Sequence, residues 1–118
     1  MEYSSGNIVL IRFPRLDLGH GKYRPVLLLD KLPGPFQDWL ICAITSQLRH
    51  NIPDWDEIIS PSDTDFEQSG LKVHSLIRIG KLATIDESIF EGKLGSISQD
   101  RLQRIRTKLS DRLVPNKS

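Results

Sequence analysis

Two apolar runs of strand length stand on either side of a turn in the first half of the chain, RPVLLLD at 24–30 and DWLICAITS at 38–46. The intervening KLPGPFQ contains two prolines and a glycine, residues that interrupt regular structure and favour a turn. Nearly continuous apolar runs are typical of strands at the centre of a sheet. Pro25 is tolerated because the first residue of a strand need not donate a ladder hydrogen bond. If the two strands pair antiparallel, the start of the first lies beside the end of the second.

Further short strands are indicated on both sides of this pair. NIVLIRF at 7–13 has the alternation and the branched residues of a strand, and the loop PRLDLGHGKY follows it. EIIS at 57–60 predicts another strand, and an acidic connector spans 61–70. LKVHSLIRIGKLATI at 71–85 predicts one bent strand or two short ones, with a bulge or bend at Gly80.

The C-terminal segment changes to a helical period. Ser98 can cap a helix, and Ile97 stands where a hydrophobic staple would meet the first apolar residue of that helix. Apolar residues recur every three or four positions at Leu102, Ile105, Leu109 and Leu113. Short strands closed by turns, with one terminal helix, predict a mainly β fold: a small antiparallel barrel with a C-terminal helix, in a single domain covering 1–118.

Composition narrows the class of protein. The chain has 118 residues, a hydrophobic share of 38%, a charged share of 26% and a net charge of +1, as in an ordinary folded, soluble domain. Anion binding would therefore need a local cationic patch. No apolar run approaches the roughly 20 residues of a membrane span, and the N-terminus lacks the pattern of a secretion signal, so we expect a cytoplasmic protein without membrane contact. The single cysteine, Cys42, lies in an apolar run and is expected in the core.

The polar groups that could do chemistry stand at strand ends. The sequence has no glycine-rich phosphate loop, no nucleophile elbow and no clustered metal ligands, so we expect neither a cofactor nor a metal. Arg24 with Thr45 and Ser46 would form a cradle for a phosphodiester, because a guanidinium donates in a planar fork and hydroxyls add directional donors. In the alternative interpretation Arg24 pairs with Asp17 or Asp30, and the two hydroxyls only turn the chain.

The order of these segments resembles the MazF/PemK family of toxin ribonucleases. The matching segments are GNIVLIRF, GKYRPVLLL, ICAITSQ and HSLIRIGKLATID, with a last helix after GSIS, so the resemblance covers nearly the whole chain. It implies an SH3-like barrel, a homodimer, and sequence-specific, metal-independent cleavage of single-stranded RNA. It also implies a cognate MazE-like antitoxin whose extended tail occupies the RNA groove. An endoribonuclease of this kind, an mRNA interferase, needs no cofactor.

The resemblance also assigns catalytic residues. The arginine before proline falls on Arg24 and the threonine of the ITSQ strand end on Thr45, and the later arginine of the PemK branch falls on Arg78. Three departures concern other positions. Asn7 replaces an acid, Gly80 stands where the PemK branch has an aspartate that is a candidate base, and the glutamate of the loop before the RP motif is absent. That loop offers His20 instead, a residue whose usual pKa near ~6.5 suits a general base, although a loop histidine can equally be solvated and idle.

Cationic residues at strand ends and in loops predict a positive groove for RNA. Besides Arg24 and Arg78, the residues predicted to bind RNA are Lys22, Ser46, Gln47, Arg49, His50, Trp55 and Lys72. Trp55 is the candidate for base stacking because it lies in a polar loop, whereas Trp39 is expected in the core or an interface. His74 is expected on a strand face. The helix cations Arg101, Arg104, Arg106, Lys108 and Arg112 are expected to form a solvated face.

Two other classes of function remain open. A barrel of this kind without cleavage activity would be an RNA-binding or antitoxin-binding module. A toxin such as CcdB has the same barrel and inhibits a protein target through the end of its last helix, but the tail RLVPNKS offers little apolar anchor for such binding. RNA cleavage in excess EDTA discriminates these classes. For the homodimer we expect an interface formed by the third strand, the loop around LPGPF and part of the last helix.

Overall fold

The structure is a computed structural model and describes residues 2–13 and 22–114. Six strands, two α-helices and two 3-10 turns follow in the order β1 (Asn7–Phe13), β2 (Lys22–Lys31), β3 (Asp38–Thr45), η1 (Leu48–His50), β4 (Glu57–Ile59), α1 (Phe66–Ser69), β5 (Ser75–Asp86), η2 (Glu87–Ile89), β6 (Phe90–Ser96) and α2 (Gln99–Leu113). The five predicted strand regions and the predicted C-terminal helix are confirmed, although the third strand ends at Thr45. Strand β6 and the short helix α1 were not predicted from the sequence.

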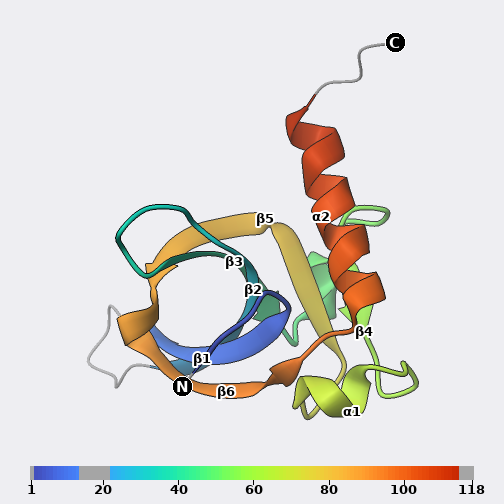
Figure 1. The fold of residues 1–118 in the computed structure, drawn as a ribbon. Coiled ribbons are helices and arrows are strands. Elements are labelled where there is room, and N and C mark those ends of the chain that lie inside the picture. Colours follow the sequence, from blue (N-terminus) through green and yellow to red (C-terminus); the bar gives the residue numbers. More distant parts are fainter. Residues whose placement is uncertain (1, 14–21, 115–118) are drawn as a thin grey trace.

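The strands form one antiparallel sheet in the order β4-β5-β3-β2-β1-β6. The predicted hairpin of β2 and β3 is present, with Val26 opposite Ala43 and Leu28 opposite Ile41. Figure 1 shows β1, β2, β3, β5 and β6 curving into a ring, with α2 standing beside it. The ladders among the described residues end at β6 on one side and at β4 on the other, so the barrel is strongly curved rather than closed by hydrogen bonds.

Strand β5 is bent by a bulge at the predicted position. On the partner strand β3, Ala43 pairs with Arg78, whereas the preceding residue, Cys42, pairs with Leu82. Residues 79–81 of β5 therefore have no partner in the ladder. The bulge divides β5 into one half that also pairs with β4 and another half that continues around the ring. Such an insertion increases local twist and redirects side chains.

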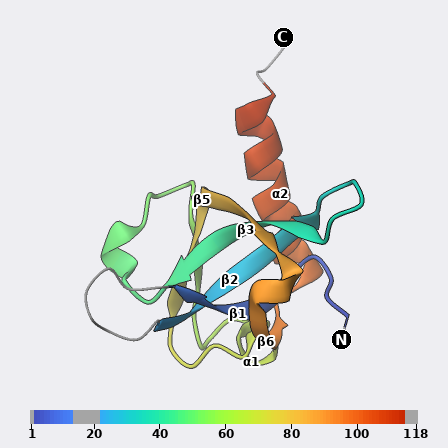
Figure 2. The same cartoon turned by 90° about the vertical axis from the view of Figure 1, so that its left-hand side faces the viewer.

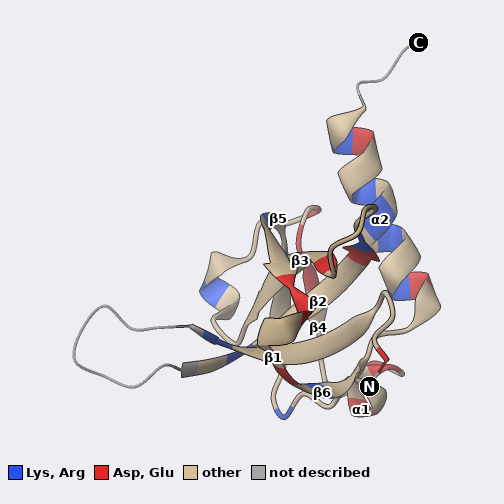
Figure 3. Cartoon of the chain, turned by 60° about the vertical axis from the view of Figure 1, so that its left-hand side comes forward, with Lys and Arg blue, Asp and Glu red and all other residues tan. Residues whose placement is uncertain are grey.

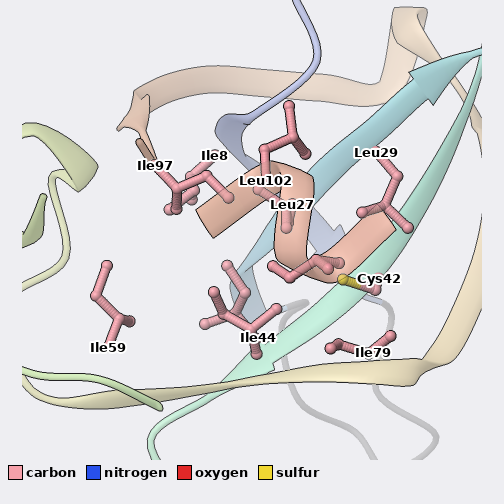
Figure 4. Packing of buried hydrophobic residues seen from close by; sticks show 11 residues of the cluster. Ile8, Leu27, Leu29, Cys42, Ile44, Ile59, Ile79, Ile97 and Leu102 are labelled. Carbon is pink, nitrogen blue, oxygen red and sulfur yellow. The ribbon is translucent and has the colours of Figure 1, made fainter. Parts of the chain in front are cut away.

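Two apolar cores lie on the two faces of the sheet, because alternate residues of a strand point to opposite faces. The core inside the ring consists of Val9, Ile11, Val26, Leu28, Trp39 and Ile41. The other core lies between the sheet, β4 and α2, and includes Ile8, Leu27, Leu29, Cys42, Ile44, Ile59, Ile77, Ile79, Ile97, Leu102 and Ile105 (Figure 4). Trp39 and Cys42 are both buried, as expected.

Helix α2 begins as the sequence predicts. The Ser98 hydroxyl accepts a hydrogen bond from Arg101 N at 3.1 Å, which caps the first turn. Ile97 and Leu102 belong to the same buried core, as in a hydrophobic staple. The apolar stripe continues through Ile105 and Leu109 but ends there, because Leu113 is 72% exposed.

The prediction that the cations of α2 form a solvated face is wrong for Arg101, whereas Arg104 and Arg112 are exposed as predicted. Arg101 is only 6% exposed. Its guanidinium donates to Asp65 at 2.9 Å, to Glu57 at 3.0 Å and to Asp63 at 3.1 Å. Arg104 and Lys108 donate to the same Glu57. These ion pairs bind α2 to the acidic connector and to β4. Figure 3 shows blue segments along α2 and red segments on the neighbouring chain.

Candidate functional site

Arg24 and Thr45 stand side by side, as the antiparallel hairpin requires. Val26 pairs with Ala43, and the same register continued by two residues places Arg24 opposite Thr45. Figure 2 shows the start of β2 and the arrowhead of β3 at the same edge of the sheet. Directly paired residues of neighbouring strands project to the same face. The sheet therefore brings a guanidinium and a hydroxyl together from positions 21 residues apart in the sequence (45 − 24).

An open pocket of about 420 Å³ lies at this edge. Its lining comes from the start of β2, from residues 44–47 at the end of β3, and from the stretch 70–73 together with Ser75 and Leu94. The two charged residues of this described lining, Arg24 and Lys72, are both cationic and exposed. Ser46 and Gln47 add exposed polar groups. The pocket thus has the composition of an anion site, with donors converging from several segments.

The Thr45 hydroxyl is oriented by the chain that follows it. Thr45 Oγ1 accepts a hydrogen bond from Gln47 N at 3.1 Å. A hydroxyl has one hydrogen to donate in addition to its acceptor lone pairs. Because the backbone amide occupies a lone pair, the hydroxyl hydrogen is available for an acceptor in the pocket, such as a phosphate oxygen.

One wall of the pocket is fixed by a close backbone contact between α1 and β6. Gly70 ends α1 with φ 77°, a conformation that favours glycine. A Cβ at Gly95 in β6 would lie 2.0 Å from the Gln68 carbonyl oxygen, so only glycine allows this approach. Ser69 Oγ accepts from Leu71 N at 3.1 Å and so continues the support into the wall. The stretch that presents Lys72 to the pocket is therefore fixed by the close approach of α1 to β6 and by the hydrogen bond between Leu71 and Ser69.

Tyr23 is a pocket residue that the sequence did not indicate as part of a site. Its hydroxyl accepts a hydrogen bond from Arg12 on β1, and that guanidinium carbon lies 4.6 Å from the ring centroid. The ring is 48% exposed beside Arg24. Its only sequence signal is its position next to the arginine of the RP pair, which does not distinguish a pocket wall from a surface tyrosine.

Comparison with known proteins supplies the family. The model of the family described as "PemK-like, MazF-like toxin of type II toxin-antitoxin system" matches residues 4–113. The chain belongs to this family. The family is one of endoribonucleases, so this toxin belongs to that enzyme class. No curated protein matches the sequence.

Three solved structures share the fold. A MazE-MazF complex from Deinococcus radiodurans is similar with a TM-score of 0.69 and 22% identity, covering 97% of this chain and 98% of that one. A second form of that complex gives a TM-score of 0.70 at 21% identity, covering 97% of each chain. A mycobacterial endoribonuclease in complex with its cognate antitoxin gives a TM-score of 0.64 at 18% identity, covering 98% of this chain and 100% of that one. At these identities the likeness concerns the fold.

Arg78, the third arginine that the toxin family suggests, lies outside this pocket. It is half-buried on β5 opposite Ala43. It lines a smaller depression together with Trp55, Gly80 and Lys81. Arg78 therefore lies on the strand next to β3, opposite a residue two positions away from Thr45, and not in the cradle of Arg24 and Thr45.

The other cationic and histidine residues predicted for the site lie at different places in the toxin. Arg49 and His50 are exposed on η1, which follows the end of β3. His74 is exposed just before β5, so its expected place on a strand face is wrong. Lys22 begins β2, but its side chain lies outside the described part of the chain, and so does the whole of His20.

One of the two acids that could have paired with Arg24 has another partner. Asp30 lies 3.6 Å from Arg106 of α2. The other, Asp17, belongs to the residues that the structure does not describe. Within the described residues, Arg24 forms no ion pair and no hydrogen bond through its side chain.

The single cysteine of the toxin belongs to the core rather than to the pocket. Burial, with a contribution from the charge of Asp56, raises the pKa of Cys42 to about 12, so its thiol stays protonated at neutral pH. Across the described ranges, no three His, Cys, Asp or Glu side chains are grouped so that they could hold a metal ion. No helix in those ranges is long and apolar enough to span a membrane.

Proposed function

We propose that this toxin cuts single-stranded RNA at specific sequences without a metal ion, and that the cut takes place in the pocket of Arg24 and Thr45. The observation behind this proposal is that both charged residues of the described pocket lining are cations, next to a hydroxyl whose hydrogen is available. Such an arrangement suits a phosphodiester, whose single negative charge is shared by two non-bridging oxygens.

The reaction that these groups support is attack by the RNA itself. The 2′-oxygen of a ribose forms a bond to the neighbouring phosphorus, the bond to the 5′-oxygen breaks, and a proton moves from the 2′-hydroxyl to the leaving oxygen by way of the protein or water. Arg24 would stabilise the charge on the non-bridging oxygens while Thr45 and Ser46 orient them. One such donor contributes roughly 3 kcal/mol to the stabilisation of a transition state. DNA lacks the attacking hydroxyl and should not be cut.

The direct test is incubation of the purified protein with long single-stranded RNA in excess EDTA. We expect fragments with a 2′,3′-cyclic phosphate and a 5′-hydroxyl. Arg24→Ala should slow cleavage about 10²–10³-fold. Arg24→Lys should restore little, because an ammonium cannot donate to two oxygens as a planar guanidinium does. Lys93→Ala, at an exposed position on β6, is the matched control and should cut normally.

Two results would contradict this chemistry. Fragments with a 3′-hydroxyl and a 5′-phosphate would mean that water, not the ribose, attacks the phosphorus, and a requirement for Mg²⁺ would mean that a metal takes part. Equal activity of Arg24→Lys and the parent would return Arg24 to a structural role.

His20 is our proposal for the general base, made from the sequence alone. A neutral imidazole accepts the proton of the 2′-hydroxyl, so cleavage should rise with pH as the imidazole loses its own proton. His20→Ala should remove that rising limb while leaving the fold intact by circular dichroism. An unchanged pH profile would assign the base elsewhere.

We further propose that the toxin is a homodimer and that a cognate antitoxin blocks the same pocket. The family description places the chain in type II toxin-antitoxin systems. An antitoxin segment bound across Arg24 and Lys72 would compete directly with RNA for the two cations.

A further inference from the structure

A second depression, of about 160 Å³, lies on β5 beside the pocket and is lined by Ile52, Trp55, Asp56, Arg78, Gly80 and Lys81. We propose that it binds the nucleotide next to the cut, with the base on Trp55 and the phosphate between Arg78 and Lys81. This inference rests on the proposed function, because it names a subsite for the same RNA strand. It also changes the role of Arg78 from catalysis to binding of a flanking phosphate.

Backbone hydrogen bonds fix the loop that carries Trp55. Trp55 N donates to the Ile52 carbonyl at 3.1 Å, and Lys108 of α2 donates to the Trp55 carbonyl at 3.1 Å. The side chain is half-buried and packs against the core beneath α2. A stacking platform with few accessible rotamers loses little entropy when a base binds, which favours recognition.

Asp56 joins the loop of Trp55 to the bulge of β5. Its two carboxylate oxygens accept from Ile52 N at 2.9 Å and from Ile79 N at 3.1 Å. Asp56 is only 9% exposed, and hydrogen bonds from both amides occupy its charged oxygens. The carboxylate therefore fixes the floor of the depression, while the exposed rim is cationic through Lys81 and half-buried Arg78.

The bulge explains why two cations and an indole meet here. In a regular strand, positions 78 and 81 would point to opposite faces. Because residues 79–81 leave the ladder, Arg78, Gly80 and Lys81 all line one depression. Gly80 is needed for this contact, since a Cβ at that position would lie 3.1 Å from Trp55 Nε1. A larger residue would push the indole away from its present position.

The depression lies within reach of an RNA strand bound in the first pocket. Arg78 is opposite Ala43, two residues along β3 from Thr45, which corresponds to about 7 Å. Pairing places Arg24, Thr45 and Arg78 on the same face of three adjacent strands. A phosphodiester at Arg24 and Thr45 thus leaves the neighbouring nucleotide beside Arg78.

The test uses the intrinsic fluorescence of the full-length protein titrated with a single-stranded oligodeoxynucleotide, which cannot be cut by 2′-hydroxyl attack. We expect quenching that reports Trp55, because Trp39 is only 3% exposed. In anisotropy titrations of the same oligonucleotide carrying a fluorescent label, which do not depend on tryptophan emission, Trp55→Ala should weaken the Kd about 5-fold to 100-fold. Since Trp55 also packs on the core, Lys81→Gln at an exposed position serves as a second variant, and it should lower the salt slope of binding by about 0.7. Lys93→Gln is the matched control and should change neither quantity.

The outcomes separate the subsite from the nuclease. If the wild-type protein cuts RNA but shows no quenching, and both Trp55→Ala and Lys81→Gln bind like the control, the subsite is overturned and the nuclease stands. If quenching and both losses are found but RNA is not cut, the subsite stands as a nucleic-acid site and the proposed nuclease falls. A change in the base preferred next to the cut in Trp55→Ala would support both.

Discussion

Arg101 shows at the scale of one residue why a buried charge needs a full set of partners. Its guanidinium is surrounded by the carboxylates of Asp65, Glu57 and Asp63 and also donates to the Ile58 carbonyl at 3.2 Å. No buried side-chain polar atom among the described residues lacks a hydrogen bond. Removing one member of such a cluster leaves the others desolvated and without their counter-charge. The free energy lost in this way exceeds the net stabilisation that the intact cluster provides.

We therefore predict that Arg101→Gln lowers the free energy of unfolding by about 3–5 kcal/mol. Arg112→Gln, on an exposed position in the last turn of the same helix, should change it by less than about 0.5 kcal/mol. Urea unfolding followed by circular dichroism measures both. Equal stability of the two variants would show that the cluster contributes nothing to the fold.

The same residue marks the limit of what the sequence predicts. The proximity of Arg24 and Thr45 followed from one hairpin, whose register is set by a short turn between two apolar runs. Two partners of Arg101, Asp65 and Asp63, are 36 and 38 residues away in a connector whose acidic composition indicates only a loop. Nothing in the spacing of the helix cations distinguishes Arg101, which is buried, from Arg112, which is not, because the apolar stripe alone does not give the rotation of the helix against the connector.

At the scale of elements, ion pairs bind α2 to β4 and to the acidic connector, in addition to the apolar core that α2 shares with β4. Burial raises the pKa of Glu57, but hydrogen bonds from Arg104 and Lys108 outweigh it and hold the pKa below its usual value. Burial likewise opposes ionisation of Asp65, and hydrogen bonds from Arg101 and Ser98 lower its pKa. In the unfolded chain both carboxyls titrate near pH 4.

From these shifts we predict that the protein loses stability in acid. Both folded-state pKa values are lowered, so the contribution is complete above about pH 5 and is lost as the pH falls through the unfolded and then the folded pKa values. The free energy of unfolding, measured between pH 7 and pH 3, should fall below pH 5. Arg101→Gln should show a flatter fall. A parent profile with no decline below pH 5 would contradict the role of this contact.

Two elements escaped sequence prediction for local reasons. FEGKLGS, which forms β6, has two glycines and few branched residues, so its strand propensity is low. It becomes a strand because β1 pairs with it and because Gly95 lets α1 approach its backbone. Helix α1 is only four residues long and lies within a polar stretch, where no apolar period can be recognised.

At the scale of the whole molecule, one apolar groove has no partner within the described chain. It lies between α2 and the sheet, has a volume of about 340 Å³ and is lined by Leu29, Asp30, Leu40, Arg106, Leu109 and Leu113. Leu113 is 72% exposed, and Phe36, in the loop between β2 and β3, is 67% exposed. Large exposed apolar side chains favour an interface. These are the segments expected from the sequence to form the dimer.

We predict a homodimer at micromolar concentration that weakens when this surface is made polar. Leu113→Ser with Phe36→Ser should shift the population toward monomer in sedimentation equilibrium. Val73→Ser, at an exposed apolar residue that lines the pocket of Arg24 and Thr45, is the control and should leave the dimer unchanged. A monomeric parent protein, or a dimer unaffected by the double variant, would place the contact elsewhere.

The binding of β4 to α2 also determines how the native molecule opens. β4 has only three residues in the ladder and lies at the edge of the sheet, while its Glu57 is bound by three cations of the helix. When α2 detaches, β4 and the connector lose most of what holds them, so these segments should form one cooperative unit. In native-state hydrogen exchange the amides of β4 should then exchange together with those of α2 at low denaturant. The amides of β2 and β3, at the centre of the sheet, should exchange only when the whole domain unfolds, so a molecule with its helix released would keep the hairpin that presents Arg24 and Thr45.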